Sequence, residues 1–568
     1  MVKTLAIVGA RLNSSRLAGK HLLPLAGEPM IGHIWRRLKE CKEVDDFELA
    51  TTADDFNRPL LEWAEEHQVD CHPYKGDVND LMGRLDNIIR RNDPDYILYV
   101  CGDCPLVDPG FIDHGLSALK SSSKDGVTLK AEIQSLHEGL SFYSRKGWNK
   151  LVAASQSSMT REHVGYADKV SPVLDKLYIE DFADYSRVKH RISVDTEADY
   201  RLMSEIYNRW YQNHRADSIV DLKWVQQLLL DTPKLRTINE HVQQKLPEKH
   251  YSKINLYCHI GLKIGLGHLK RCAFIAEALQ ERLGTGTEIF VVGQACELPW
   301  LRTKTSWLEN DSELFAQLSN DTNRLLVLDF NPSFIDEAAL LPICEQIDRK
   351  GSSIVAIDKM TSLLPVAKLL FIPSFFTRLH DPKVSFGWDH YLFEKTLRLK
   401  KKNLILVLTG GSDALGFGRS LPGVLEQTLH PDWQCIWVQG PLAPAPNITE
   451  ADKIELAINP TNLTELMASA KIVVTCYGLS FFESMAAKAA VVLLPAQEIC
   501  EEDELNALKK EDACLVSYST EEAATLVNHL QSSPEQISEL SEKAGLLFCN
   551  LNGKSIITQK ISAIIHTF

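Results

Sequence analysis

Residues 254–283 read INLYCHIGLKIGLGHLKRCAFIAEALQERL and contain a short apolar run, a glycine-bearing loop and a helix-like pattern in succession. The run INLYCHIG (254–261) has the composition of a buried strand. Gly265 and Gly267 come next and stand just before His268. Apolar residues then recur with the spacing of one helix face, at Leu269, Cys272, Ala273, Ala276 and Leu279. The stretch therefore predicts a strand, a tight loop and a helix that begins beside a histidine.

The same alternation of apolar run and helical pattern extends in both directions along the chain. Toward the C-terminus, strand-like runs occur at 325–330, 353–358, 404–413, 471–478 and 490–496. Toward the N-terminus they occur at 4–10, 47–52, 96–103 and 191–195, with helix-like stretches such as 28–42 and 79–91 between them. Because alternating strands and helices favour largely parallel sheets, we predict an α/β fold throughout.

A polar segment and a charged run indicate where the domains end. The chain has 568 residues, which is too long for one ordinary hydrophobic core. Residues 232–252 turn polar just before the strand predicted at 254, and the charged run RLKKKN occupies 398–403. We predict a domain at 1–235, a linker at 236–253, and two further lobes at 254–397 and 398–568.

Composition and charge indicate an ordinary soluble protein. The chain is 45% hydrophobic and 24% charged, and its formal net charge of −14 argues against a nonspecific nucleic-acid coat, which needs a basic face. The N-terminus lacks a signal-peptide pattern, and no stretch reaches about 18 uninterrupted apolar residues. We expect a cytoplasmic enzyme without a membrane span or a nucleic-acid partner.

The thirteen cysteines are scattered without the spacing of a disulfide framework. Cys101 and Cys104 form a close pair in CGDC, and no second pair completes a zinc site. The pair leaves two interpretations open, a thioredoxin-like redox site or free buried thiols in a reducing cytoplasm.

Cations and hydroxyls crowd into the loop after the first predicted strand. Residues 10–31 read ARLNSSRLAGKHLLPLAGEPMI, with Arg11, Ser14, Ser15, Arg16 and Lys20 around Gly19. Such a loop can wrap a polyphosphate with backbone N–H groups and guanidinium groups, although a solvated basic loop is the alternative. Asp103 and Asp195 each follow a strand-like run, where carboxylates point into the ligand crevice of a parallel sheet. Two carboxylates beside a triphosphate predict a magnesium site.

Four segments of the first part of the chain resemble one family in its own motif order. ARLNSSRLAGKHLLPLAGEPMI, KGDVNDLMGRL (75–85), GDCPLVDP (102–109) and REHV (161–164) are similar to cytidylyltransferases of the spore-coat-polysaccharide type, relatives of the CMP-sialic acid and CMP-Kdo synthetases. Over about 1–210 the resemblance implies a nucleotide-diphospho-sugar transferase (GT-A-like) fold and transfer of CMP from CTP to a sugar hydroxyl. It implies that magnesium binds Asp103 and Asp195, and that the CTP phosphates are held by Arg11, Ser15, Arg16 and Lys20.

A helix that begins at His268 would place this ring where an anion binds. A helix N-terminus carries about half a positive charge and presents free N–H groups. The same field disfavours the imidazolium form, so we expect a neutral His268 that can act as a general base. Service as a hydrogen-bond donor at the helix end is the equally open alternative.

Two later segments offer a partner site for the same ligand. LTGGSDALGFG (408–418) and CYGLSFFESMAAKAAVVLLPAQ (476–497) both read as a strand followed by a turn. Backbone groups at Gly410, Gly411 and Ser480 could meet a diphosphate. Glu483, one turn into its predicted helix, could accept hydrogen bonds from both hydroxyls of a ribose, and a solvated helix carboxylate is the alternative.

These segments together resemble the GT-B-fold UDP-sugar hydrolase of the pseudaminic acid pathway and its spore-coat relatives, over about 254–565. The matching runs are Gly-x-Gly-His-x-x-Arg-Cys (265–272), Gly-Gly-Ser-Asp (410–413) and Gly-x-Ser-x-x-Glu (478–483). The resemblance implies a pair of Rossmann-type lobes and attack of water on the anomeric carbon of a UDP-linked diacetamido sugar, without a metal. It implies His268 as the base, and the UDP-binding residues Gly267, Gly410, Gly411, Ser412, Ser480 and Glu483.

The leading hypothesis is a bifunctional enzyme of surface-glycan biosynthesis, of the nonulosonic acid type. One module would transfer CMP from CTP to a sugar with Mg²⁺, and the other would hydrolyse a UDP-linked amino sugar. A second hypothesis makes the C-terminal module a glycosyltransferase. A third makes one module an inactive nucleotide-binding scaffold, because Tyr99, Phe330, Lys359 and Ala496 depart from the family patterns. CTP, a UDP-sugar and small sugars are the expected ligands, and a homodimer is one option for the oligomeric state.

Overall fold

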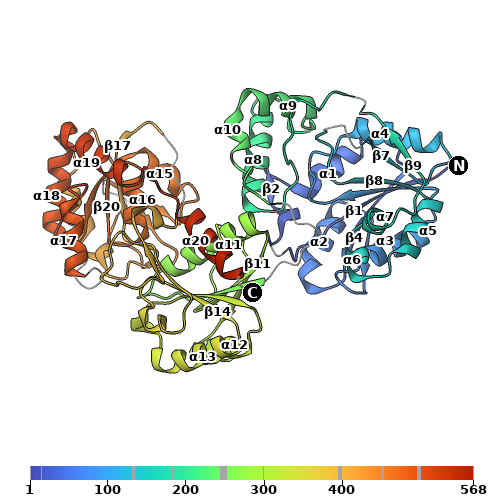
Figure 1. Ribbon diagram of the computed structural model, residues 1–568. Coiled ribbons are helices and arrows are strands. Elements are labelled where there is room, and N and C mark those ends of the chain that lie inside the picture. The colour runs from blue at the N-terminus through green and yellow to red at the C-terminus, as the bar shows by residue number, and fades with distance from the viewer. Residues whose placement is uncertain are drawn as a thin grey trace. The chain divides into compact units, whose positions relative to one another are not determined.

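The computed structural model describes residues 2–14, 16–130, 135–181, 183–243, 253–298, 300–393, 399–449, 453–494 and 501–566. It divides into two compact units, one of residues 1–251 with 280–284 and the other of residues 252–279 with 285–568 (Figure 1). The predicted linker at 236–253 lies largely outside the described residues, at 244–252. The predicted domain limits therefore stay predictions, and each unit is described by itself.

The first unit is built on a seven-stranded sheet with the order β5-β4-β1-β6-β8-β7-β9. Its strands are β1 (Thr4–Gly9), β4 (Asp46–Thr52), β5 (Cys71–Tyr74), β6 (Tyr96–Cys101), β7 (Gly126–Leu129), β8 (Leu140–Ser144) and β9 (Lys176–Ile179). All pairs are parallel except those that β8 makes with β6 and β7. The carboxyl ends of β1 and β6 therefore meet at one edge of the sheet, where the predicted phosphate loop and Asp103 follow them.

Helices cover both faces of this sheet because both faces of its central strands are apolar. One face packs on α1 (Met30–Leu38), α2 (Arg58–Glu66) and α4 (Pro109–Lys120), and the other on α3 (Leu81–Asn92) and α5 (Arg145–Ala154). A separate apolar cluster joins α8 (Glu197–Tyr211) and α9 (Leu222–Asp231) to the loop after β1. This cluster fixes the predicted phosphate loop against the segment that contains Asp195.

The prediction of a strand at 191–195 was wrong. This segment is irregular, and its Val194 N–H donates to the carbonyl of Asp103 at 2.8 Å. The apolar residues Ile192 and Val194 are buried against α8 and α9 instead of extending the sheet. Strand-like composition arises here from burial alone, without a neighbouring strand to pair with.

The second unit contains two parallel sheets that share one strand order. The first runs β12-β11-β10-β13-β14-β15-β16 and the second β19-β18-β17-β20-β21-β22. The first comprises β10 (Lys253–His259), β11 (Gly286–Val292), β12 (Thr305–Leu308), β13 (Leu325–Asp329), β14 (Ser353–Ile357), β15 (Leu369–Ile372) and β16 (Val384–Phe386). The second comprises β17 (Lys402–Leu408), β18 (Gln434–Gln439), β19 (Ile454–Ile458), β20 (Ala470–Thr475), β21 (Ala490–Leu493) and β22 (Leu515–Val516). The α/β prediction, with two Rossmann-type lobes after an N-terminal nucleotidyltransferase-like domain, is confirmed.

In each sheet the strand order reverses beside the first strand, and ligands of doubly wound sheets bind at this reversal. The reversal falls between β10 and β13 in one lobe and between β17 and β20 in the other. Helix α11 (Gly267–Leu283) follows β10, and α16 (Leu479–Ala486) follows β20. The expected binding edges therefore carry His268 in one lobe, and Glu483 and the turn at Gly410–Gly411 in the other.

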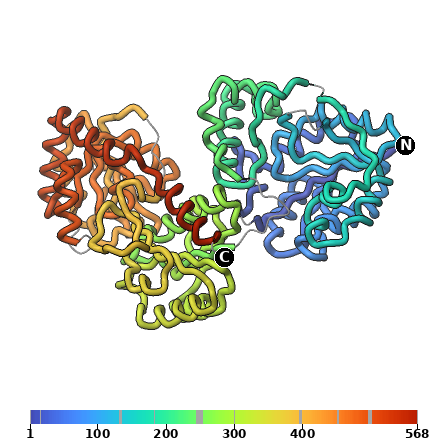
Figure 2. The backbone as a smooth tube through the Cα atoms, in the orientation of Figure 1, coloured from blue at the N-terminus to red at the C-terminus, as the bar shows by residue number. Residues whose placement is uncertain are grey.

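The C-terminal helix α20 (Gly553–Ile565) returns to the lobe of β10, where Figure 2 shows the red end of the chain beside the green segment of α11. Lys554 pairs with Glu277 at 3.3 Å and lies 4.1 Å from the ring centroid of Phe274, both residues of α11. The return ties the two lobes of this unit together. Among the described residues, no helix is both long and apolar enough to cross a bilayer.

Candidate nucleotide sites

Lys20 joins the two carboxylates that the sequence places in one site. Its Nζ lies 3.0 Å from Oδ2 of Asp103 and 2.8 Å from Oδ1 of Asp195, and it also donates to the carbonyl of Val194 at 2.9 Å. Burial lowers the pKa of Lys20, but Asp103 and Asp195 outweigh burial and raise it above its ordinary value. Lys20 is therefore a buried ammonium group between two aspartates.

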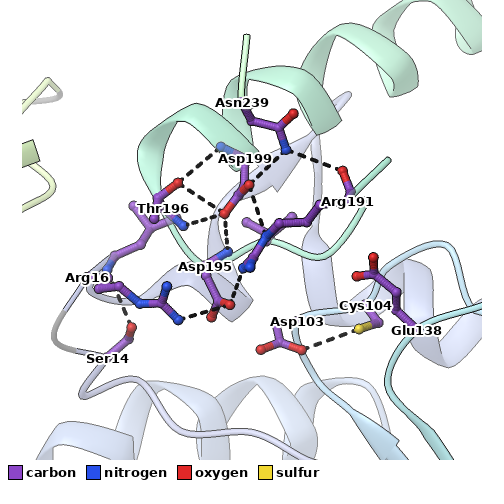
Figure 3. Close-up of polar contacts among 12 residues, drawn as sticks. Ser14, Arg16, Asp103, Cys104, Glu138, Arg191, Asp195, Thr196, Asp199 and Asn239 are labelled. Carbon is purple, nitrogen blue, oxygen red and sulfur yellow. Dashed lines mark hydrogen bonds and ion pairs between the residues drawn. The ribbon is translucent and has the colours of Figure 1, made fainter. Parts of the chain in front are cut away.

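Two arginines converge on the same aspartate from different segments (Figure 3). Arg16 pairs with Asp195 Oδ2 at 3.0 Å, and the Nη2 of Arg191 donates to the same oxygen. Burial would raise the pKa of Asp195, but Lys20, Arg16 and Arg191 hold it well below its ordinary range. The Nη1 atoms of both arginines are buried and have no hydrogen-bond partner among the described residues. The cluster thus holds guanidinium donors that a bound anion could satisfy.

Hydrogen bonds to backbone N–H groups hold Asp195 just before the N-cap of α8. Thr196 caps this helix, and its partner in the capping box is Asp199. Asp199 Oδ2 accepts from the backbone N–H groups of Asp195 and Thr196 at 3.1 and 3.0 Å. Asn239 donates to the other oxygen of Asp199 at 2.8 Å (Figure 3). Asp195 is therefore positioned by a capped helix end and not by a strand.

Arg11 does not join this cluster and binds residues of two other segments instead. Its Nη1 donates to the carbonyl of Val78 at 3.0 Å and to Oδ1 of Asn79 at 2.9 Å, and its Nη2 lies 3.6 Å from Glu162. Arg161 binds Asp80 at 2.6 Å beside it. Three of the quoted family motifs therefore meet at Arg11, apart from the cluster around Asp195. Ser14 accepts from the backbone N–H of Leu17 at 3.4 Å, and Ser15 lies outside the described residues.

Asp103 and Asp195 fit a magnesium ion by their donor chemistry. Both are oxygen donors within hydrogen-bond distance of one nitrogen atom, so they lie close enough to share one cation. Within the described ranges, no cluster of three or more histidine, cysteine or acidic residues could hold a metal on protein atoms alone. Phosphate and water oxygens would complete such a site, as is usual for Mg²⁺.

Both cysteines of CGDC are free thiols, with Cys104 buried and Cys101 half-buried. Burial raises the pKa of Cys101 to about 12 and raises that of Cys104 well above its ordinary value. Reactive cysteines usually have a lowered pKa, so these raised values favour the interpretation as free thiols. Glu138 lies near Cys104 (Figure 3), and burial raises its pKa.

In the second unit, His268 pairs with a carboxylate at the end of the neighbouring strand. Its Nδ1 lies 2.7 Å from Oδ1 of Asp329, the last residue of β13, which is fully buried. Because a carboxylate only accepts, Nδ1 carries the proton and Nε2 is the basic nitrogen. Arg271 Nη2 also lies 3.0 Å from Nδ1, but both groups are donors in this state. A histidine held by an aspartate has the arrangement of an oriented general base.

Arg271 supplies the charge that keeps this aspartate ionised. Its Nε and Nη2 bind the two oxygens of Asp329 at 2.9 and 2.7 Å, and its Nη1 binds Asp358 at 2.6 Å. Burial favours the protonated acid, yet the charge of Arg271 and the hydrogen bonds from His268 and Arg271 keep the pKa of Asp329 well below its ordinary range. The side chain of His268 is 12% exposed, so the basic nitrogen belongs to a nearly closed site.

The glycine turn after β17 faces the loop before α11. A Cβ added to Gly265 would lie 3.7 Å from Oγ of Ser412, and one added to Gly411 would lie 3.0 Å from Leu266. Gly410 has a φ of 88°, and a Cβ there or at Gly267 would meet nothing within 4 Å. The two lobes therefore bring together a helix N-terminus and a turn, with open space beside both. Asp413 has a structural role, since it accepts from the N–H groups of Phe417 and Gly418 at 3.1 and 2.8 Å.

Glu483 lies on α16 and is only 8% exposed. Its Oε1 accepts from Lys270 Nζ of α11 at 2.6 Å. Its Oε2 is buried and has no hydrogen-bond partner among the described residues. A buried acceptor without a donor suits a ligand hydroxyl and does not suit the alternative of a solvated carboxylate. Ser480 is the second residue of the same helix and is half-buried.

Sequence reasoning missed several residues of these sites. Asp329 ends a strand-like run, as Asp103 does, so the same signal could have identified it as a partner of His268. Arg191 lies in a segment predicted to be a strand, and that pattern carries no signal for an arginine that binds Asp195 four positions later. Lys270 carried no signal, because only the tertiary structure brings it to Glu483.

The geometry defines two nucleotide-binding candidates, one in each unit. Residues 5–222 match the family model described as cytidylyltransferase, so the first unit is similar to that family over most of its length. The match does not extend into the second unit, which has the GT-B-like arrangement of two parallel sheets.

Two individual proteins are also similar in sequence to part of this chain. An uncharacterised protein of Methanocaldococcus jannaschii is 28% identical over 247 residues, which cover 43% of this chain and 97% of that protein. The 3-deoxy-manno-octulosonate cytidylyltransferase of Geotalea daltonii is 33% identical over 141 residues, which cover 25% of this chain and 54% of that enzyme. The chain thus spans about half the length of this characterised relative.

A similar solved structure is known for the second unit. The S. aureus MnaA–UDP co-structure superposes with a TM-score of 0.40 at 13% identity, and the match covers 56% of this chain and 98% of that one. The GT-B-like description of the second unit rests on its own strand order.

Proposed function

We propose that the chain is a bifunctional nucleotide-sugar enzyme of surface-glycan biosynthesis. The first unit would transfer CMP from CTP to a sugar hydroxyl, and the second would hydrolyse a UDP-linked amino sugar of the type used in nonulosonic acid synthesis. The observation that carries the first half is the cluster in which Lys20 binds both Asp103 and Asp195. Arg16 and Arg191 bind Asp195 as well.

The charges of this cluster suit an exchange of partners when CTP binds. In the structure the three cations neutralise the aspartates. Asp103 and Asp195 would hold Mg²⁺, which would supply charge neutralisation for the phosphate oxygens. Arg16 and Lys20, released from the aspartates, would then bind the triphosphate together with the loop that contains Ser15.

The proposed chemistry in the first unit needs positioning rather than a covalent intermediate. The hydroxyl oxygen of the acceptor sugar forms a bond to the α-phosphorus of CTP and releases its proton to water. The bond from that phosphorus to the β-phosphate oxygen breaks, and pyrophosphate leaves. The cations of the cluster stabilise the charge that develops on the leaving group.

The pair of His268 and Asp329 supports hydrolysis in the second unit. Water would attack the anomeric carbon and give its proton to Nε2 of His268, while the bond from that carbon to the UDP oxygen breaks. Asp329 holds the ring and stabilises the imidazolium that forms. The ribose would bind Glu483, and the diphosphate would bind between the turn at Gly410–Ser412 and the N-terminus of α11.

Ligand-dependent melting tests both halves, because a ligand that binds only the folded state raises its stability by about 2.7 kcal/mol at a hundredfold excess over Kd. CTP with Mg²⁺ and UDP should each raise the melting temperature, and Asp103→Asn should abolish pyrophosphate release from CTP while leaving the UDP response intact. Unchanged pyrophosphate release in Asp103→Asn would contradict the first site.

Product analysis separates the candidates for the second unit. Release of UDP from a UDP-amino sugar in buffer supports the hydrolase. Release that depends on an added sugar acceptor would make this unit a glycosyltransferase. Binding of UDP without turnover of any UDP-sugar would instead make it a scaffold.

A further inference from the structure

The ion pair between Lys270 and Glu483 connects helix α11 of one lobe to helix α16 of the other. The ammonium nitrogen lies 2.6 Å from Oε1, and the two side chains differ sharply in exposure, at 40% for Lys270 and 9% for Glu483. The side chain of Lys270 is therefore long and partly exposed to solvent, while the carboxylate of Glu483 is buried. If the pair separates, the lysine is the partner that can move.

Glu483 retains acceptor capacity that this pair does not use. Its Oε2 is buried without a hydrogen-bond donor among the described residues. An unsatisfied buried acceptor is costly, so donors from a ligand would be favourable at this atom. Hydroxyl donors from a ribose would also compensate the carboxylate if the ammonium group left it.

Open space lies one helical turn away from Lys270. Lys270 follows Gly267 by three positions in α11, so the two residues share a face of the helix. A Cβ added at Gly267 would meet nothing within 4 Å, and the same holds for Gly410 in the facing turn. An anion bound beside this turn would lie within reach of a four-carbon lysine stem.

We propose that Lys270 is a diphosphate-binding residue that pairs with Glu483 until a nucleoside diphosphate binds. When a nucleoside diphosphate binds, the ribose hydroxyls donate to Glu483 and the ammonium group moves to the phosphate oxygens. A nucleoside without phosphates offers no anion, so Lys270 stays on Glu483 and contributes nothing to its affinity. The inference rests on the proposed UDP site and adds a cation that discriminates between phosphorylated and unphosphorylated ligands.

Calorimetric titration of the full chain with UDP and with uridine tests this role. Lys270→Met should weaken UDP binding about tenfold or more, because a charge-assisted contact is lost, and should leave uridine binding within about threefold. Lys270→Arg should restore most of the UDP affinity. Lys510→Met, which removes an exposed lysine of α17 (Glu502–Lys510), is the matched control and should change neither value.

The outcomes separate this inference from the function beneath it. Unchanged UDP affinity in Lys270→Met overturns the inference, and so does an equal loss for UDP and uridine, which would mean that Lys270 merely holds Glu483 in place. If the wild-type chain binds no UDP at all, the proposed site itself fails and the inference fails with it. Glu483→Gln should weaken both ligands, which marks the carboxylate as the ribose contact.

Discussion

Asp329 shows how one buried side chain can serve both stability and chemistry. It accepts from Arg271 through both oxygens and from His268 through one. A lone buried carboxylate would be costly, but the guanidinium group offsets this cost and leaves the aspartate ionised. An ionised Asp329 fixes the histidine tautomer, which leaves Nε2 as the basic nitrogen.

Changing His268 to Asn should separate binding from chemistry. Asn can still donate a hydrogen bond to Asp329, and Arg271 keeps this aspartate paired, so we expect UDP affinity within a few fold of the wild type. Asn cannot accept a proton from water, so turnover of the UDP-sugar should fall by about 10² or more. Steady-state kinetics with parallel UDP titration measures both quantities. A variant that keeps its rate at saturating substrate but loses affinity would make the histidine a binding group only.

His259 should make the folded second unit less stable as the pH falls. Burial, followed by the neighbouring ring of His268 and the charge of Arg271, lowers its pKa to about 3 despite the opposing charge of Asp329. An unfolded histidine binds a proton near pH 6.5, whereas the folded one stays neutral until about pH 3. Stability from this group is therefore complete above about pH 6.5 and falls as the pH drops, by at most about 1.4 kcal/mol per pH unit.

Thermal unfolding at pH 7.5 and pH 5.0 measures this effect. His259→Gln keeps an acceptor for the backbone N–H of Asn331, which now donates to His259 Nε2 at 2.7 Å. The variant should lose less stability than the wild type between the two pH values. An identical loss in both proteins would show that His259 does not titrate during unfolding.

The turn between β17 and α14 (Leu421–Glu426) depends on close backbone approach by the end of β18. A Cβ added to Gly440 would lie 2.5 Å from the carbonyl oxygen of Gly411 and 2.7 Å from that of Gly410. Leu442 also donates from its backbone to Gly411 at 2.9 Å. The position of the predicted diphosphate turn is thus set by a neighbouring strand end that carries no functional group.

Replacing Gly440 with Ala should push this turn out of place. Overpacking of this kind costs about 1–3 kcal/mol, and we expect both a lower melting temperature and weaker UDP binding. Gly423→Ala in α14 is the matched control, because its Cβ would meet nothing within 4 Å at an exposed helix position. This control should be neutral or stabilising by up to about 1 kcal/mol. Equal behaviour of the two variants would refute the packing argument.

The two units should behave as separate folding and binding modules. Each has its own sheets and apolar clusters, and the family match stops within the first unit. Limited proteolysis should cut within 236–253 and release two stable fragments. The melting temperature of the smaller one should respond to CTP with Mg²⁺, and that of the larger one to UDP. Cleavage scattered through 100–200 would contradict the predicted boundary.

Much of the architecture was predictable because parallel βα units leave a strong local pattern. The runs at 4–10, 47–52, 96–103, 254–261, 325–330 and 353–358 all became strands, since buried parallel strands are continuously apolar. The run at 191–195 has the same composition but no strand to pair with, and composition alone cannot reveal this.

The candidate sites divide in the same way. Residues that end a strand or begin a helix, such as Asp103 and His268, are local in sequence, and parallel strands bring such ends to one edge. Their partners are not local, since Lys20 reaches Asp195 across 175 positions and Lys270 reaches Glu483 across 213. Local sequence therefore fixed the elements, the edges and the chemical groups. Only tertiary packing decided which charges meet, because pairing between distant segments depends on how whole helices and sheets bury their apolar faces.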